Sequence, residues 1–598
     1  MIDAGIKGFL SRSSEMASPK RIAIIGAGPS GLTAIKCCKE EGFIPVCYER
    51  NNDPGGLWRY HDEDIEGVAS VMKTTIINTS KEMSSFSDFP PPKDFPNFMH
   101  NSKMLEYFLL YAENFNLLRH IRYHLEVIKV EPTKDFETTG RWTVTVKSTQ
   151  TEATSKEEFD GVLVCIGHHV FPNIPTFPGQ YKFKGTIVHS HSIKNCERFE
   201  GQRVVVVGIG NSGVDAAVDC TFVAKQASNV VFCLFINQIS HPFYICILNV
   251  LSFTIMIKVY LSTRRGSWIM GRVGDNGKPY DLDFATRKNE LFGKFMSYDK
   301  KCKLFEEKLN MKFDHAAYNL KPKHRMFSAH PTLNDSLPNC ILSGRVIVKG
   351  DIESFEENGV VFAGENTVTK IDAVILATGY EIKFPFLDNR VISTKNNRVH
   401  LYKYAVPPNL KQPTLAFVGL IQPLGPIFPV AEMQCRWFAQ IMAGKLKLPS
   451  EKVMEKEIEY KNKANAKRYV NTTRHTIQVD WIPFMDELAE MFGAKPNLLK
   501  LSITDPVLFW HCFKGPCLPY QYRLQGPHSW PGAREAILTC ENRVYAPLNS
   551  SGKKPCEEKD KLITGKSLLF VLTMPMFLPL GSRNFLRAST IVNVDLDS

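Results

Sequence analysis

The sequence predicts an α/β fold made of two similar units, and two glycine-rich turns support that prediction. The first turn, Gly26-Ala27-Gly28-Pro29-Ser30-Gly31, follows the apolar run 22–25 and precedes a helical pattern. The second turn, Gly208-Ile209-Gly210-Asn211-Ser212-Gly213, follows the valine run 204–207. A strand, a glycine turn and a helix in this order are typical of a dinucleotide-binding βαβ unit. Two such turns in 598 residues predict two Rossmann-like units.

The first turn lies within a complete βαβ pattern. The run 22–25 predicts a buried strand, residues 32–40 have helical apolar spacing, and residues 45–48 predict a second strand. Glu49 ends that strand, where a carboxylate accepts hydrogen bonds from a ribose diol. We expect the nucleotide phosphates to bind the unpaired N–H groups at the helix N-terminus.

The glycines of the first turn have separate roles. Gly26 allows the tight turn, Gly28 lets the backbone approach a pyrophosphate, and Gly31 lets the helix pack closely on the strand. The second turn repeats this pattern, and Asp215 opens the helix that follows it. One turn alone fits many dehydrogenases. Two turns fit a flavoprotein that takes hydride from a nicotinamide, with the two nucleotides face to face.

Composition narrows the class of partner. The formal charge is +12, but no Lys/Arg block is long enough for a nucleic-acid arm, so the excess is diffuse and favours anionic ligands or a membrane surface. The 15 cysteines form no C-x-x-C pair, which disfavours a zinc ribbon and a thioredoxin-reductase-like dithiol. Unpatterned cysteines indicate reduced thiols facing the cytosol. His168 and His169 have no ligand partners at useful spacing, so we expect no metal site.

Beyond the first unit the chain resembles the flavin-containing monooxygenases, most of all the vertebrate microsomal, N-oxide-forming dimethylaniline type. Asp53 to Arg59 contains the G-G-x-W-R element that continues the FAD fingerprint of that family. The likeness runs through residues 78–83, 88–90 and 95–100, and then from about 260 to 546. Phe183-Lys184-Gly185-Thr186-Ile187-Val188-His189 resembles the identifying motif F-x-G-x-x-x-H, which is largely architectural; Ile193 replaces its usual aromatic residue.

The resemblance implies FAD, NADPH and O2 as the reactants. NADPH would reduce FAD, and the C4a-hydroperoxyflavin formed with O2 would oxygenate soft nitrogen or sulfur atoms of small, xenobiotic-like amines and sulfides. This chemistry needs no Ser/His/Asp triad or carboxylate pair, and none is visible. Asn78 is the expected catalytic residue, because it matches the family asparagine beside the flavin ring. Without the surrounding motif, an asparagine here would be an ordinary turn residue.

The resemblance also implies the residues that bind each cofactor. For FAD these are Gly26, Ala27, Gly28, Pro29, Ser30, Gly31, Glu49, Leu57, Trp58, Ile77, Asn78, Thr79 and Gln434. For NADPH they are Gly208, Gly210, Ser212, Gly213, Val214, Asp215 and Arg264.

Arg264 is the cation expected to bind the 2′-phosphate, but it lies 56 residues after Gly208, about thirty more than the motif usually spans. The extra length contains an apolar insertion, residues 226–257, without Asp, Glu, Lys or Arg. The insertion is long enough for a membrane span, yet a span here would interrupt a nucleotide-binding sheet. We therefore expect an inserted apolar segment. If residues 229–236 replaced the second strand, NADPH binding would be lost first.

The resemblance implies an FAD-binding domain interrupted by the NADPH-binding domain. The expected parts are an N-terminal extension (1–17), the first FAD part (18–172), the NADPH domain (173–379), the second FAD part (380–447), a helical and loop region (448–550) and a tail (551–598). The tail has an apolar segment, 568–580, broken by Pro575 and Pro579 and shorter than the roughly twenty residues of a spanning helix.

The family likeness predicts association with the surface of the endoplasmic reticulum membrane, with the catalytic domains facing the cytosol. An oligomer is compatible with the sequence.

Three alternatives to this function stay open at this point. The same flavin chemistry would serve an NADPH oxidase that releases hydrogen peroxide, or a Baeyer–Villiger-type oxygenase. A non-catalytic relative that binds FAD, disabled by the insertion, is the third.

Overall fold

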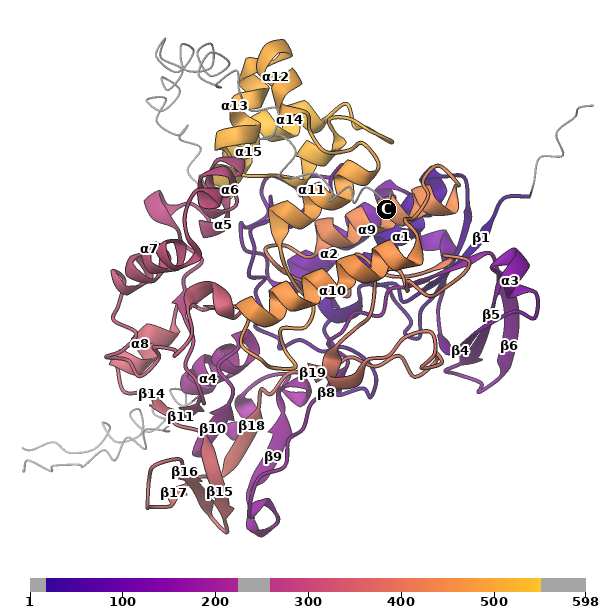
Figure 1. Cartoon of the computed structure of the whole chain (residues 1–598). Coiled ribbons are helices and arrows are strands. Elements are labelled where there is room, and N and C mark those ends of the chain that lie inside the picture. The colour runs from indigo at the N-terminus through magenta and orange to yellow at the C-terminus, as the bar shows by residue number, and fades with distance from the viewer. Residues whose placement is uncertain (1–17, 224–258, 550–598) are drawn as a thin grey trace, which may run out of the picture.

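The computed structural model, which describes residues 18–223 and 259–549, contains two parallel five-stranded sheets (Figure 1). In the first sheet the order is β20 (Leu415–Phe417), β7 (Gly161–Val164), β1 (Arg21–Ile25), β2 (Ile44–Tyr48) and β3 (Ile121–Arg122). In the second it is β14 (Val346–Lys349), β11 (Val259–Ser262), β10 (Val204–Val207), β18 (Ala373–Leu376) and β9 (Thr186–His189). The predicted α/β class is confirmed.

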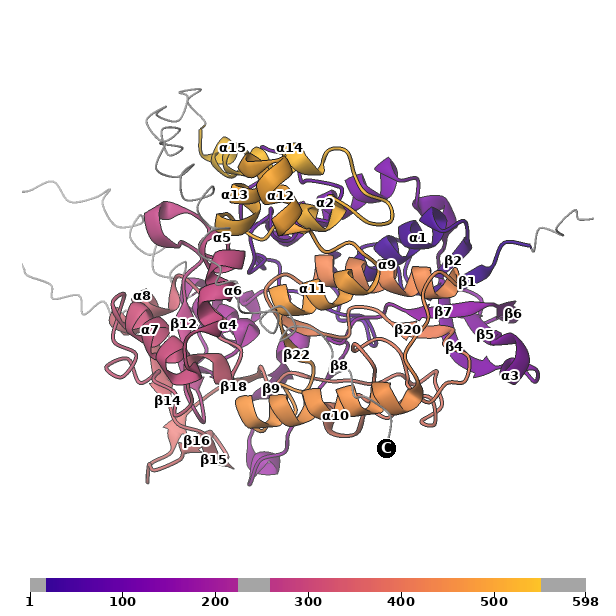
Figure 2. The same cartoon turned by 45° about the horizontal axis from the view of Figure 1, so that its top comes forward.

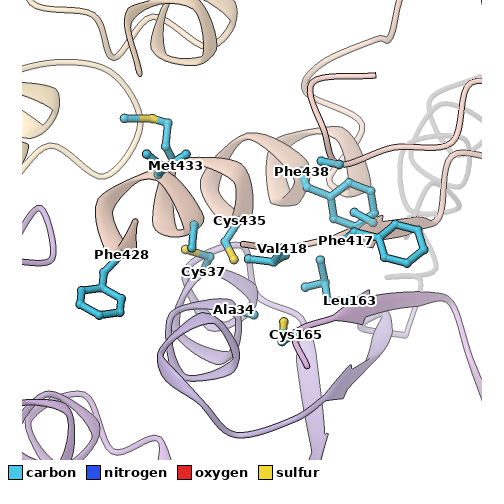
Figure 3. Close-up of a cluster of buried hydrophobic side chains, with 14 of the residues drawn as sticks. Ala34, Cys37, Leu163, Cys165, Phe417, Val418, Phe428, Met433, Cys435 and Phe438 are labelled. Carbon is cyan, nitrogen blue, oxygen red and sulfur yellow. The ribbon is translucent and has the colours of Figure 1, made fainter. Parts of the chain in front are cut away.

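The first βαβ unit forms as the sequence predicts. Strand β1 is followed by helix α1 (Pro29–Glu40) and β2, and the two strands pair in parallel. Helix α1 packs against α9 (Phe428–Met442), a helix from the far end of the chain (Figure 3). Buried side chains of these two helices and of the neighbouring strands form one cluster, among them Ala34, Cys37, Leu163, Cys165, Phe417, Cys435 and Phe438. Burial on both faces explains why the parallel strands are continuously apolar.

The second unit has β10, α4 (Asn211–Val223) and β11 in the same arrangement. Val204 lies opposite Val259, and Val207 opposite Ser262. Both edges of β10 are occupied, by β11 and β18. The possibility that residues 229–236 replace the second strand is therefore wrong. Arg264 consequently lies two residues beyond the end of its strand. Residues 226–257 themselves lie outside the described residues.

The first sheet is completed only after the chain has built the second. The chain leaves through β8 (Phe171–Pro172) and returns through β19 (Tyr380–Glu381), and these two strands pair antiparallel. It then adds β20 beside β7. One unit is therefore inserted into the other, as the discontinuous fold requires.

Smaller elements surround the two sheets (Figure 2). The other strands are β4 (Leu125–Pro132), β5 (Trp142–Ser148), β6 (Thr154–Phe159), β12 (Ile269–Met270), β13 (Thr332–Leu333), β15 (Ile352–Glu356), β16 (Gly359–Phe362), β17 (Thr369–Lys370), β21 (Gln422–Leu424) and β22 (Gln478–Asp480). The other helices are α2 (Asn101–Asn114), α3 (Phe136–Thr139), α5 (Tyr280–Phe284), α6 (Arg287–Lys294), α7 (Tyr298–Asn310), α8 (Leu337–Leu342), α10 (Glu451–Arg468), α11 (Trp481–Met491), α12 (Leu498–Thr504), α13 (Pro506–Lys514), α14 (Ala533–Leu538) and α15 (Cys540–Tyr545).

Buried charges attach the C-terminal helices to the first unit. The fully buried guanidinium of Arg523 lies 3.0 Å from Oε1 of Glu432 and 3.0 Å from Oδ2 of Asp88. Asp88 also receives Lys36 Nζ at 2.6 Å. Because an isolated buried charge is unfavourable, these groups depend on one another to remain inside.

Within residues 18–223 and 259–549, no helix has the length and apolar character to cross a membrane. The N-terminal extension (1–17) and the apolar segment 568–580 fall outside the described residues.

Candidate functional site

The first glycine turn has little room for side chains. Gly26 has φ +96°, and a Cβ there would lie 3.0 Å from the Cys165 carbonyl oxygen. A Cβ on Gly31 would lie 1.9 Å from the Gly26 oxygen. The N-cap of α1, Gly28, offers no side-chain hydrogen bond to the first helical turn. The N–H groups of that turn can therefore bind phosphate oxygens.

Glu49 is held against this turn. Its Oε2 accepts the Ala27 N–H at 2.8 Å, and its Oε1 accepts the Asn51 N–H at 3.0 Å. The side chain is buried, and each carboxylate oxygen has a second lone pair available for a ribose hydroxyl. The carboxylate thus lies where the sequence predicts it.

The Gly-Gly-x-Trp segment lies beside the same turn. A Cβ on Gly56 would lie 3.0 Å from the Cα of Gly28. Leu57 and Trp58 follow in a short 3₁₀ helix, and the Trp58 ring meets Phe428 edge-on at 6.0 Å. The structure thus brings Leu57 and Trp58 to the first turn.

Asn78 has a fixed side-chain orientation. Its Oδ1 accepts a hydrogen bond from Nη2 of Arg272 at 2.8 Å, and its backbone oxygen accepts one from the Tyr280 hydroxyl at 3.2 Å. Because a guanidinium only donates, the amide oxygen must face Arg272. The NH2 group of Asn78 is then directed away from Arg272, available to donate to a ligand.

The residues around Asn78 are held by further hydrogen bonds. Ile77 donates its N–H to the Met99 oxygen at 2.9 Å, and the hydroxyls of Thr79 and Ser84 lie 2.6 Å apart. Asp281 Oδ2 accepts the N–H of the next residue, Ser80, at 2.6 Å. Burial raises the pKa of Asp281 to about 6.

The second glycine turn repeats the geometry of the first. Gly208 has φ +118°, and a Cβ there would lie 2.4 Å from the Ala377 oxygen. A Cβ on Gly213 would lie 2.0 Å from the Gly208 oxygen. Thr332 supports the turn by donating its hydroxyl to the Ile209 oxygen at 2.6 Å. Both turns therefore need glycine for backbone packing.

A chain of polar contacts joins this turn to Asn78. Asp215 Oδ1 accepts Nδ2 of Asn334 at 2.9 Å, and burial raises the pKa of Asp215 to about 6. The adjacent residue, Asp335, pairs with Arg272 Nη1 at 3.1 Å. Arg272 in turn holds Asn78. The structure thus links two residues that were predicted for different cofactors.

The remaining predicted residues of the second unit lie on α4 and after β11. Ser212 is exposed in the first turn of α4, whereas Val214 is buried in the core beneath it. Arg264 has a side chain 72% exposed, and its Nε lies 3.7 Å from Oδ2 of Asp351. This pair is long enough to leave the guanidinium open to a phosphate.

Gln434 lies inside the protein rather than on a surface. Its Oε1 accepts the Gly419 N–H at 3.0 Å, and its Nε2 donates to the Lys403 oxygen at 3.2 Å. These bonds support the backbone after β20. Its predicted contact with FAD stays a prediction.

The F-x-G-x-x-x-H motif joins strand ends in the second sheet. His189, the last residue of β9, places Nε2 3.1 Å from the Gly379 oxygen just after β18. Ile193 is fully buried in the core of this unit. The rings of His168 and His169 meet edge-on, with their centroids 4.3 Å apart.

Sequence reasoning missed Arg272, Tyr280 and Asp281, the residues that hold the Asn78 loop. Arg272 and Asn78 are 194 residues apart. No motif marked any of the three, so only the tertiary structure brings them into view.

Comparison with known proteins identifies the family. A family model described as "Flavin-binding monooxygenase-like" matches residues 19–235 and 247–579. The chain belongs to this family. Human flavin-containing monooxygenase 5 is 48% identical over 534 residues, which cover 88% of this chain and 93% of the relative. "Dimethylaniline monooxygenase [N-oxide-forming] 2" of Cavia porcellus is 40% identical over 560 residues, 93% of this chain and 98% of the relative.

A solved structure supports the fold of this flavin monooxygenase. The S-allyl-L-cysteine S-oxygenase of Allium sativum superposes with a TM-score of 0.55 at 23% identity, covering 79% of this chain and 88% of that one. The gap in the family match, residues 236–246, falls inside the apolar insertion. The family of this enzyme uses FAD and NADPH. The uncapped N-terminus of α1 and the Glu49 carboxylate fit FAD, and the turn at Gly208 with Arg264 fits NADPH.

Proposed function

We propose that this flavin monooxygenase uses NADPH and O2 to oxygenate nitrogen or sulfur atoms of small, soft nucleophiles. The observation that carries the proposal is the fixed orientation of the Asn78 amide, whose Oδ1 accepts a hydrogen bond from Nη2 of Arg272 at 2.8 Å. An NH2 donor held in this way can stabilise a developing negative charge without taking up or releasing a proton. Soft nucleophiles attack electrophilic oxygen themselves, so a positioned donor is sufficient.

The proposed roles of the other residues follow from their geometry. FAD supplies the redox chemistry with oxygen when bound. The first turn and α1 would hold its diphosphate, and Glu49 its ribose. The turn at Gly208 would hold NADPH, and the exposed guanidinium of Arg264 would bind the 2′-phosphate.

The test separates four outcomes with one set of assays. The FAD-loaded enzyme is reduced anaerobically with NADPH, O2 is admitted, and products from a tertiary amine, a sulfide and a ketone are measured beside hydrogen peroxide. N-oxide and S-oxide formation supports the proposal. Ester from the ketone alone would favour Baeyer–Villiger chemistry, and peroxide alone an oxidase. Failure of NADPH to bleach the flavin would indicate the non-catalytic relative.

We also propose that the enzyme acts at the cytosolic surface of the endoplasmic reticulum membrane, as its membership of the family suggests. Support comes from apolar side chains exposed at one end of the molecule. Helix α13 packs against both α6 and α12 (Figure 1). Phe292 of α6 is 56% exposed and Ile503 of α12 is 76% exposed. Co-sedimentation with anionic liposomes, compared between the natural chain and a Phe292→Ser/Ile503→Ser variant, tests this surface; equal sedimentation would contradict it.

A further inference from the structure

The guanidinium of Arg474 lies over the second glycine turn. A Cβ built on Gly210 would lie 2.7 Å from its Nη2 and 2.9 Å from its Nη1. Only a glycine lets the guanidinium approach the backbone this closely. Gly210 immediately precedes α4, a helix of 13 residues. Arg474 is therefore beside the helix N-terminus, where the dipole already favours an anion.

Arg474 has no counter-charge among residues 18–223 and 259–549. Within these described residues, Arg474 donates a single hydrogen bond, and it comes from the backbone N–H to the Thr472 hydroxyl. Arg474 is an exposed residue, yet nearby protein atoms partly desolvate its side chain and lower the pKa of Arg474. An unpaired cation beside a helix N-terminus attracts an anion strongly, because the guanidinium and the helix dipole act in the same direction. This position is thus suited to an anionic ligand.

The neighbouring titratable groups are basic as well. Desolvation, together with the positive charge of Arg474, lowers the pKa of His330 to about 3 and of His475 to about 4, and lowers that of His169 further below its usual range. Nε2 of His475 accepts the His330 N–H at 3.3 Å, so His475 is neutral with its proton on Nδ1. Arg265 also acts on His475. Among the described residues, the charged groups that act most strongly on these imidazoles are basic.

We infer that Arg474 and the N-terminus of α4 form a diphosphate-binding site that grips the bridging pyrophosphate of NADPH. The inference rests on the proposed function, in which NADPH binds at Gly208. It divides the work between two arginines. Arg264 would select the 2′-phosphate, which only NADPH carries. Arg474 would bind the diphosphate, which NADPH and NADH share, through the planar fork of its guanidinium.

The division of roles gives a sharp test with the full-length, FAD-loaded protein. Dissociation constants for NADP+ and NAD+ are measured by titration in Arg474→Gln and Arg264→Gln. We expect Arg474→Gln to weaken both nucleotides by the same factor, about tenfold to a hundredfold, because a charge-assisted hydrogen bond is lost. The ratio of the two constants then stays unchanged. Arg264→Gln should weaken NADP+ alone and bring the ratio towards one.

Two further variants control for folding and for charge. Arg474→Lys keeps the charge but loses the fork, so it should bind both nucleotides with intermediate affinity. Lys467→Gln removes one exposed positive charge from the nearby helix α10 and should leave both constants unchanged. Retained FAD absorbance shows that each variant is folded.

Inorganic pyrophosphate separates this inference from the proposed function. It should raise the melting temperature of the natural chain and of Lys467→Gln, but not of Arg474→Gln. If the natural chain binds pyrophosphate through Arg474 but no NADP+, the proposed function fails while the anion site stands. Unchanged NADP+ affinity in Arg474→Gln would overturn the inference. A change in the NADP+/NAD+ ratio in that variant would also overturn it, by assigning Arg474 to the 2′-phosphate.

Discussion

Nη2 of Arg272 lies 2.8 Å from Oδ1 of Asn78, although the two residues are 194 positions apart in the chain. Arg272 also pairs with Asp335, beside the second glycine turn that is proposed to bind NADPH. Asn78 belongs to the loop assigned to the flavin. One arginine therefore connects the two sides at the residue proposed to assist oxygen transfer.

Replacing Asn78 with Ala should leave FAD bound and abolish N-oxide formation, because the amide donor is lost while both glycine turns stay intact. The measurements are the flavin absorbance after gel filtration and the N-oxide yield from a tertiary amine. Asn462→Ala, an exposed asparagine on α10, is the matched control. An undiminished N-oxide yield from Asn78→Ala would refute the catalytic assignment.

Replacing Arg272 with Met should release the Asn78 amide from its fixed orientation. A hydrogen bond to a charged group contributes about 1.5–3 kcal/mol, so we expect product per NADPH consumed to fall about tenfold, with hydrogen peroxide rising in its place. Arg272→Lys should recover part of the coupling because it keeps the charge.

The double variant Asn78→Ala/Arg272→Met distinguishes positioning from general damage. If Arg272 acts through Asn78, the second change adds nothing to the loss of coupling caused by the first, because the two residues act as one unit. Additive losses would show that Arg272 has an independent role.

Replacing Arg523 with Met should destabilise the fold by about 3–5 kcal/mol, because it leaves Glu432 and Asp88 buried with less compensation. Urea denaturation with excess FAD measures the change. Arg534→Met removes a half-exposed arginine that pairs with Asp505 at 2.7 Å, and should cost less than about 1 kcal/mol. Equal losses in the two variants would contradict the buried network.

The pH dependence of stability should change in Asp281→Asn. Burial raises the pKa of Asp281 from 3.8 to about 6, so between about pH 4 and 6 the folded chain keeps a proton that the unfolded chain has released. Raising the pH through this window therefore lowers the free energy of unfolding. Asparagine cannot ionise, and its oxygen can still accept the Ser80 N–H.

We therefore expect Asp281→Asn to be more stable than the natural chain at pH 8, by about 1–3 kcal/mol, and nearly equal to it at pH 4. Urea denaturation at both values, in the absence of NADPH, measures the difference. Asp94→Asn, at an exposed position, should show no such dependence. A variant less stable at pH 8 would mean that the Asp281 carboxylate is needed in its charged form.

The sequence predicted what local patterns encode. Strand β1, helix α1 and strand β2 follow from one apolar run, three glycines and helical spacing within about thirty residues. The second turn at Gly208 was equally readable. The position of Arg264 was harder to predict, because its separation from Gly208 is longer than the motif usually spans. The pairing of β10 with β11 resolves this difficulty, since it places Arg264 just after the second strand.

Contacts between distant segments left no trace in the sequence. No motif in the sequence distinguishes Arg272 or Arg474 from other arginines, whereas the fold places Arg272 beside Asn78 and Arg474 beside Gly210. The hydrogen bonds of Gln434 to the backbone of Gly419 and Lys403 were equally invisible in the sequence, and its contact with FAD stays a prediction. The positions of such side chains depend on tertiary packing, which a linear motif does not encode.

The antiparallel pairing of β8 with β19 has a consequence for how such a molecule can be assembled. The chain leaves the first unit and returns to it at neighbouring points, so the second unit is connected to the first through two paired strands. Because the two ends of the second unit are adjacent, the first unit can accept the whole insertion without a distortion of its own backbone.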